Sequence, residues 1–61
     1  MSAFVIYRDN AGEYRWHLLA SNNRKIADSG EGYQTEIDCI EAINLVKKVT
    51  PKADVKEPAL R

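Results

Sequence analysis

The fold is decided by residues 3–19, which read AFVIYRDNAGEYRWHLL. Two segments rich in aromatic and β-branched residues flank Asp9-Asn10-Ala11-Gly12, and such segments favour strands. Asp suits the first position of a type I turn, and Gly12 can adopt the left-handed conformation that closes a hairpin with a bulge. The sequence therefore predicts a β-hairpin with strands over about residues 3–8 and 13–20.

Alternation along the hairpin separates two sets of side chains, because successive residues of a strand point to opposite faces. One set is large and apolar and is expected to face the core: Phe4, Ile6, Tyr14, Trp16 and Leu18. The other set mixes apolar, basic and titratable side chains: Val5, Tyr7, Arg15, His17 and Leu19. We expect this second set to form an outer face that the chain leaves uncovered, and it is the candidate binding face.

A third strand is predicted over about residues 25–29, after a turn that contains two asparagines. The following Gly30-Glu31-Gly32 is reminiscent of a phosphate-binding loop before a helix. It lacks the third glycine or the Lys-Ser/Thr pair of such loops, and Glu31 would repel a phosphate. We interpret the segment as a connector whose glycines adopt unusual φ values.

One helix is predicted over about residues 36–50, because Thr35 is a good N-cap and Pro51 cannot continue a helix. At about 100° per residue, its core face consists of Cys39, Ala42, Ile43, Val46 and Val49. Ile37 and Leu45 fall outside that face. They give the helix more apolar surface than packing on one sheet requires, which favours contact with a second subunit.

The small size of the chain raises the question of what stabilises it. The 61 residues include nine basic and nine acidic side chains, so the formal net charge is zero. A domain this small commonly needs a disulfide, a metal or a partner subunit. Cys39 is the only cysteine, and one His with one Cys cannot complete a zinc site. Self-association remains, so we expect a homodimer without a cofactor.

Charge and hydropathy disfavour two classes of partner. No basic excess provides the footprint of nonspecific nucleic-acid binding, and no apolar run is long enough to span a bilayer. The N-terminal residues lack the charged and apolar regions of a secretory signal. We therefore expect a cytoplasmic protein with no membrane partner, and nucleic acid is a disfavoured ligand.

Four elements of the sequence together point to a known family. They are Phe4-Val5-Ile6-Tyr7, Gly12-Glu13-Tyr14-Arg15-Trp16, Gly30-Glu31-Gly32-Tyr33 and Val46-Lys47-Lys48. With these elements the chain resembles the YegP-like family of small domains of unknown function, from residue 3 to about residue 55. The resemblance implies a β-β-β-α-β unit that occurs as tandem copies or as two paired chains exchanging their C-terminal strands. It thus implies a strand over about residues 53–57, where composition alone favours disorder.

The candidate binding face departs from the family pattern. Val5 and Leu19 stand where polar or charged residues are usual, and His17 stands where Arg is common. These departures make the face more apolar than the pattern to which the chain is otherwise similar.

A catalytic site is not expected. A thiolate nucleophile needs a nearby imidazole or positive field, which makes Cys39 and His17 the first pair to consider. The predicted sheet separates them, because His17 lies on the outer face and Cys39 on the core side of the helix. Asp38 and Glu41 lie on a solvated helix face with no apolar pocket to shift a pKa.

The predicted fold is therefore α+β, with an antiparallel three-stranded meander, one helix packed on one face and a short C-terminal strand exchanged between subunits. The predicted function is a non-enzymatic homodimeric structural or interaction module. The alternative hypothesis is nucleic-acid or peptide binding through the outer face, where Tyr7 lies beside Arg15 and His17, although base-stacking platforms present two or three aromatic rings. An enzyme with a site at the dimer seam is a third, less favoured hypothesis.

Overall fold

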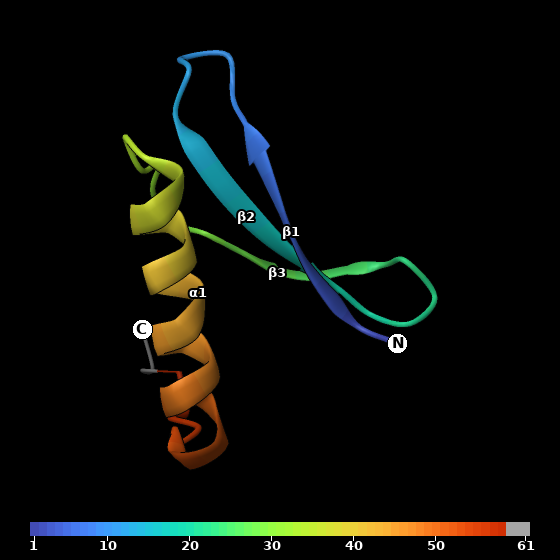
Figure 1. The fold of residues 1–61 in the computed structure, drawn as a ribbon. Coiled ribbons are helices and arrows are strands. Elements are labelled where there is room, and N and C mark those ends of the chain that lie inside the picture. Colours follow the sequence, from blue (N-terminus) through green and yellow to red (C-terminus); the bar gives the residue numbers. More distant parts are fainter. Residues whose placement is uncertain (59–61) are drawn as a thin grey trace.

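The computed structural model describes residues 1–58 and shows a twisted antiparallel sheet with a helix beside it (Figure 1). The strands are β1 (Ala3–Arg8), β2 (Tyr14–Leu19) and β3 (Lys25–Asp28), and the helices are α1 (Glu36–Val49) and the short 3₁₀ helix η1 (Thr50–Lys52). The strands are paired in the order β1-β2-β3, which is the order of a meander. The predicted three-stranded sheet with one α-helix is confirmed for the described residues.

Both turns take the conformations that their residues favour. Gly12 has a φ of 81°, and its amide donates to the carbonyl of Asp9 over 3.0 Å, which closes the first hairpin. The Asp9 carboxylate also accepts hydrogen bonds from the amides of Ala11 and Glu13 at 3.0 and 2.9 Å. In the second turn Asn23 has a φ of 67°, a conformation that asparagine tolerates better than most residues. The predicted left-handed glycine is thus confirmed.

The pairing of β3 with β2 is irregular. Ala27 lies opposite Leu18, whereas Lys25 lies opposite Leu19, so Ile26 is an extra residue in β3. Such a bulge bends an edge strand and interrupts the regular backbone that another strand could pair with. β1, by contrast, pairs with β2 in an unbroken antiparallel register along all six of its residues.

The helix begins where its capping residue predicts. The Thr35 side chain accepts a hydrogen bond from the amide of Asp38 at 3.1 Å, which satisfies one of the free amides of the first turn. At the other end α1 stops at Val49, and Pro51 lies in the short 3₁₀ helix that follows. Proline fits there because its missing amide costs nothing in the first turn of a helix.

The core lies between β2 and α1, and its centre consists of three side chains. They are Trp16, which is 6% exposed, Cys39, which is fully buried, and Ile43. Around them pack partly buried apolar side chains: Phe4, Ile6, Tyr14, Leu18, Tyr33 and Val46. The rings of Phe4 and Trp16 meet edge to face with centroids 5.2 Å apart. The set of hairpin side chains predicted to face the core is therefore confirmed.

Two expectations for the C-terminal half need correction. Val49 was expected on the core face of α1, but it is 48% exposed. It lies about 90° around the helix from the centre of the buried face, and no described element covers that rim. The glycines of the connector were expected to adopt unusual φ values, yet Gly12 is the only glycine of the chain with a positive φ.

Residues 53–57 form no strand within the single described chain. Ala53 has the extended backbone angles φ −75° and ψ 133°, and every residue from 53 to 58 is exposed. Val55 is 96% exposed, which is unusual for a valine. Strand exchange requires a second chain, so that part of the fold stays a prediction.

The small core makes Trp16 decisive for folding. Replacing Trp16 by Ala should destabilise the native state by about 3–5 kcal/mol, because it leaves a large cavity in the centre of the core. A chain of this length has a total stability of the same size, so the variant should be unfolded by circular dichroism at 25 °C. Glu41→Ala is the matched control, since Glu41 is exposed on the solvated face of α1, and it should fold normally. A folded Trp16→Ala variant would show that the core lies elsewhere.

Candidate functional site

Strand register places the five residues of the candidate binding face on one side of the sheet. Residues that are partners across antiparallel strands point to the same face. Tyr7 is opposite Arg15, and Val5 is opposite His17. Leu19 follows His17 by two residues on the same strand and therefore shares its face.

Two further residues join this outer face from β3. Asp28 lies opposite His17 and Lys25 lies opposite Leu19. Sequence reasoning missed both, because the bulge at Ile26 shifts the register of β3 and alternation along four residues could not reveal it. The ammonium of Lys25 and the carboxylate of Asp28 are 3.0 Å apart and form an exposed ion pair.

The outer face carries two neighbouring rings. The ring centroids of Tyr7 and His17 are 4.9 Å apart with an angle of 31° between the planes. Tyr7 and Val5 are exposed, whereas His17 and Leu19 are half-buried. No pocket is present on this face or elsewhere in the described part of the chain. Such a surface suits a ligand that lies flat, rather than a small molecule that must be enclosed.

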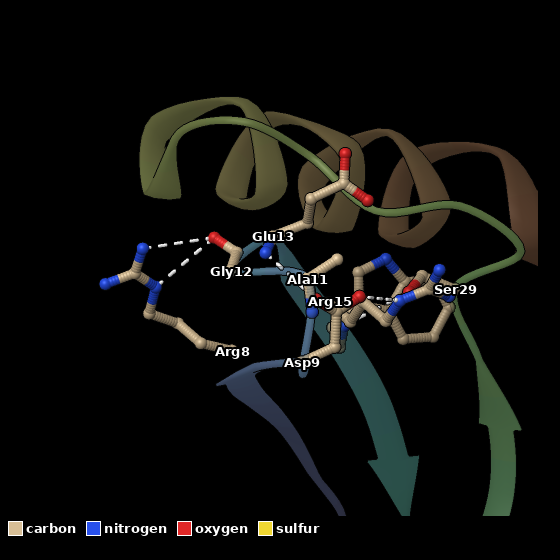
Figure 2. A network of polar contacts seen from close by, with 8 residues as sticks. Arg8, Asp9, Ala11, Gly12, Glu13, Arg15 and Ser29 are labelled. Atoms are coloured by element: carbon tan, nitrogen blue, oxygen red, sulfur yellow. Dashed lines mark hydrogen bonds and ion pairs between the residues drawn. The ribbon is translucent and has the colours of Figure 1, made fainter.

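The guanidinium of Arg15 is committed to the hairpin turn. Its Nε donates to the Asp9 carboxylate over 2.6 Å, and Figure 2 shows this contact beside the turn. This hydrogen bond, together with the one from the Glu13 amide, holds the pKa of the Asp9 carboxyl below its ordinary value of 3.8. The two cations of the outer face, Arg15 and Lys25, thus each have a carboxylate partner. The face therefore offers an approaching phosphate little net positive charge.

A second arginine fixes the same turn from the other side. Arg8 donates from its terminal nitrogen to the carbonyl of Gly12 at 3.1 Å, as Figure 2 shows, and its guanidinium lies 5.0 Å from the centre of the Tyr14 ring. Arg8 and Asp9 therefore form hydrogen bonds with the backbone of the turn, and Asp9 also pairs with Arg15. Their arrangement accounts for the Asp-x-x-Gly-Glu-Tyr-Arg pattern without invoking a ligand.

The thiol and the imidazole lie on opposite sides of the sheet. Cys39 is fully buried in the core, and burial raises the pKa of its thiol, so the group stays protonated at neutral pH. His17 is on the outer face. In this geometry a Cys–His nucleophile cannot form within one chain.

The glycine connector before α1 serves close packing. A Cβ atom on Gly32 would lie 2.8 Å from the Cβ of Glu13, a separation that real side chains do not tolerate. Next to it, Tyr33 and Tyr14 exchange backbone hydrogen bonds of 2.8 and 2.7 Å. Gly32 thus lets the connector approach β2 closely. Among residues 1–58, no group of three His, Cys, Asp or Glu side chains is placed to hold a metal.

Exposed apolar surface is concentrated on the helix and the segment after it. Ile37 and Leu45, 68% and 59% exposed, lie off the core face as predicted. Ile40 and Val49 on other sides of the helix, Val55 after it and Ile26 in β3 are exposed as well. No helix of the described part has the length and hydropathy to cross a membrane.

Comparison with known proteins gives consistent matches. A family of domains described only as of unknown function, DUF1508, matches residues 9–57. A UPF0339 protein of Neisseria meningitidis serogroup B is 48% identical over 54 residues, which are 88% of this chain and 95% of that protein. A UPF0339 protein of Methanosarcina acetivorans is 44% identical over 55 residues, covering 90% and 93% of the two chains. In Stutzerimonas stutzeri a UPF0339 protein is 44% identical over 48 residues, 79% of this chain but only 42% of that one.

Two solved structures share the fold. The solution structure of a Haloferax volcanii protein superposes with a TM-score of 0.88 at 40% identity, and it covers 93% of this chain and 95% of that chain. A solution structure from Agrobacterium tumefaciens gives a TM-score of 0.74 at 36% identity, over 93% and 90% of the two chains. Neither description states an activity.

The ion pair at the turn predicts a dependence of stability on pH. Because the pKa of Asp9 is lowered on folding, its contribution to stability is complete above the unfolded value near 3.8 and is lost as the pH falls below it. Asp9→Asn should therefore lower the free energy of unfolding at pH 7, and the difference from the wild type should shrink towards pH 2.5. Urea unfolding followed by Trp16 fluorescence, at one fixed chain concentration, measures it.

Arg15→Gln is the matched partner variant for this experiment. It removes the same ion pair by changing the arginine, and it should reduce the dependence of the free energy of unfolding on pH in the same range. An Asp9→Asn effect of equal size at both pH values would contradict the role of the carboxylate charge.

Proposed function

The chain belongs to the DUF1508 family of domains of unknown function, and from that premise we propose that it acts as a homodimeric, non-enzymatic structural or interaction module. The YegP-like resemblance inferred from its motifs is thereby confirmed. The family carries no assigned activity, so the proposal rests on the geometry of this chain.

The radius of gyration and the exposed surface area of the chain support the presence of a second subunit. Its radius of gyration is 13.4 Å, whereas a compact domain of 61 residues has a value of about 10.5 Å. The chain exposes 5354 Å² of surface, and a compact monomer of 6.9 kDa exposes about 4,000 Å². The excess is larger than the roughly 800 Å² that each partner buries in a standard interface. A second copy could therefore be accommodated on surface that a monomer of this mass does not usually expose.

The C-terminal segment is the part of the chain best suited to reach the partner. Residues 53–56 alternate, with Ala53 and Val55 on one side and Asp54 and Lys56 on the other, while Glu57 follows on the side of Val55. This pattern fits a strand with one buried face, yet within one chain every residue of the segment is exposed. The regular edge of β1 and the bulged edge of β3 are the two sheet edges open to such a strand.

The Stutzerimonas relative is consistent with this arrangement. The matched region is 42% of that protein, so the remainder is long enough for a second domain of the same size. A tandem pair would provide in one chain the partner that this chain obtains from a second copy.

The placement of the reactive side chains supports a non-enzymatic role. Cys39 is protonated and buried, Arg15 is held by Asp9, and His17 lies on a flat, open surface. Catalysis relies on groups that converge on a site sheltered from water, and the described residues bring none of these groups together.

Light scattering tests the dimer. At micromolar concentration the full chain should give twice its 6.9 kDa mass, and a variant that lacks residues 52–61 should shift towards the monomer because the linking segment is gone. A variant that lacks only residues 58–61 is the control and should remain dimeric. A cooperatively folded monomer of the full chain would overturn the proposal.

A second candidate function is ligand binding through the outer face, as an alternative role of the same module. The observation that favours it is the close approach of two rings that were expected on this face, Tyr7 and His17, whose centroids are 4.9 Å apart. Two rings on a flat sheet can stack unpaired bases or peptide side chains. The paired charges of Arg15 and Lys25 argue that any nucleic-acid affinity is weak.

A double change, Val5→Lys with Leu19→Glu, separates binding from assembly. We expect the variant to fold and to keep the dimer mass, because side chains of the outer face point away from the helix and do not block the backbone edges of β1 and β3. Retention of a labelled single-stranded oligonucleotide that persists from about 50 mM to about 200 mM salt would indicate base stacking by the wild type and should be lost in the variant, whereas retention that disappears at about 200 mM would indicate phosphate contacts instead. Loss of the dimer would instead identify the outer face as the assembly surface.

A further inference from the structure

β1 presents an open edge of the sheet. It is paired with β2 along one side, and no described strand lies along the other (Figure 1). β1 contains no proline, lysine or bulge, the features by which proteins usually protect an edge strand from further pairing. The other edge strand, β3, is bulged. β1 is therefore the edge that a further strand can extend with regular hydrogen bonds.

The hydrogen bonds of β2 show which backbone groups of β1 are free. The carbonyl of Trp16 accepts from the amide of Ser29, so the backbone groups of Trp16 point away from β1. In an antiparallel pair, directly opposite residues either bond to each other or both point outwards. Ile6 is opposite Trp16 and therefore directs its amide and carbonyl to the open edge. Alternation places those of Phe4 and Arg8 there as well.

Two cations lie at the ends of this open edge, on the face of the sheet that the helix covers. The guanidinium of Arg8, at one end, donates to the neutral carbonyl of Gly12. The ammonium of Lys47, at the other end, lies 6.0 Å from the centre of the Phe4 ring. Among residues 1–58 neither cation forms an ion pair with a carboxylate. The edge therefore has positive charge at both ends and the apolar side chain of Ile6 between them.

Apolar side chains border the open edge on both faces of the sheet. Phe4 and Ile6 are half-buried on the helix side, and Val5 and Tyr7 are 37% and 38% exposed on the outer face. A strand added beside β1 places alternate side chains against each of these rows. Apolar side chains fit opposite Ile6, and β-branched side chains fit opposite Val5 and Tyr7.

The charges disfavour a second copy of β1 as the added strand. The antiparallel pairing of two β1 strands that satisfies all the free backbone groups has Ile6 opposite the partner's Ile6. That register places Arg8 opposite the partner's Phe4, and so towards the partner's Lys47. Like charges that face each other destabilise a strand pair, and here they would meet at both ends. A strand with a carboxylate at each end is the complementary occupant.

We propose that β1 binds an extended acidic segment of another protein as an additional antiparallel strand. The inner side of this segment has the pattern acidic-x-apolar-x-acidic, which brings its two carboxylates to Arg8 and Lys47 and its apolar side chain to Ile6. The two x positions are β-branched and pack beside Val5 and Tyr7 on the outer face. This inference rests on the interaction role proposed above and does not require the dimer.

Hydrogen exchange measured by nuclear magnetic resonance tests the proposal residue by residue. The probe is the synthetic peptide acetyl-Glu-Val-Ile-Val-Glu-amide, added to the full chain. The amides of Phe4, Ile6 and Arg8 should exchange quickly in the free chain and at least about tenfold more slowly with saturating peptide. The amides of Val5 and Tyr7 point to β2 and are the internal control, because the peptide should change their exchange little.

Modified peptides test the backbone pairing and the charges separately. N-methylation of the peptide's isoleucine removes a donor that faces β1 and should abolish binding. N-methylation of either valine alters an amide that points away and should leave the dissociation constant within about threefold. A peptide with lysine in place of both glutamates should bind at least about tenfold more weakly. Equal binding by the two kinds of methylated peptide would contradict strand addition.

Two variants of the chain test the position of the charge. Lys47→Gln should raise the dissociation constant of the acidic peptide about 2- to 5-fold, as expected for the loss of one exposed ion pair. Lys48→Gln is the matched control, because it removes the same charge about 100° further around the helix, and it should leave the constant unchanged. Equal effects of the two substitutions would show that the peptide senses only the net charge.

Light scattering on the same samples separates this inference from the proposed dimer. A dimer whose exchange does not respond to the peptide overturns the inference and leaves the dimer standing. Slow exchange at Phe4, Ile6 and Arg8 without peptide would show that a second copy occupies the edge, and it also overturns the inference. A monomeric chain that binds the peptide with the expected protection supports the inference and overturns the dimer.

Discussion

Trp16 contacts neighbours in both outer parts of the sheet and in the helix, and the fold depends on how it is held. It lies in β2, the central strand, which has a hydrogen-bonded neighbour along each of its two edges. Its ring meets Phe4 of β1 and packs with Cys39 and Ile43 of α1, while its amide donates to Ser29 at the end of β3. One residue thereby links β1, α1 and the end of β3 to the central strand, in a core with one large side chain at its centre.

Much of the hairpin could be predicted from sequence because its determinants are local. The alternation of apolar and polar residues determined which side of β2 faces the helix, and the chemistry of Asp9 and Gly12 determined the turn. Thr35 likewise marked the start of the helix, since a capping hydrogen bond spans only three residues. Each of these features depends on neighbours within a few positions, and the five outer-face residues follow from the same alternation.

The features that sequence could not predict depend on contacts between distant segments. Gly32 is required because Glu13 of the hairpin lies against it, which no property of the connector itself reveals. The bulge at Ile26 brings Lys25 and Asp28 onto the outer face, and the exposure of Val49 depends on how far the sheet extends beneath the helix. The ring contact between Tyr7 and His17 joins residues that are diagonal, not directly opposite, on β1 and β2, so it depends on how the two strands are offset. In each case the deciding partner lies in another element, so periodicity within one element carries no signal.

The separation of the two faces of the sheet has a consequence for how such a module can be used. On the inner face the packing around Trp16 leaves little freedom, because a change in volume there is felt by every element of the fold. Val5, His17 and Leu19 lie on the opposite face of the sheet from that central cluster, so substitutions there can change the surface while the core stays the same. The departures of this chain from the YegP-like pattern at those three positions are of that kind. In the proposed dimer the two outer faces would be held at a fixed distance and orientation. A ligand long enough to contact both would bind the second face at an effective concentration set by that geometry, and so more tightly than it binds one face alone. Assembly through the helix and the C-terminal segment is therefore compatible with sequence divergence on the outer face of the sheet, because the two involve different residues.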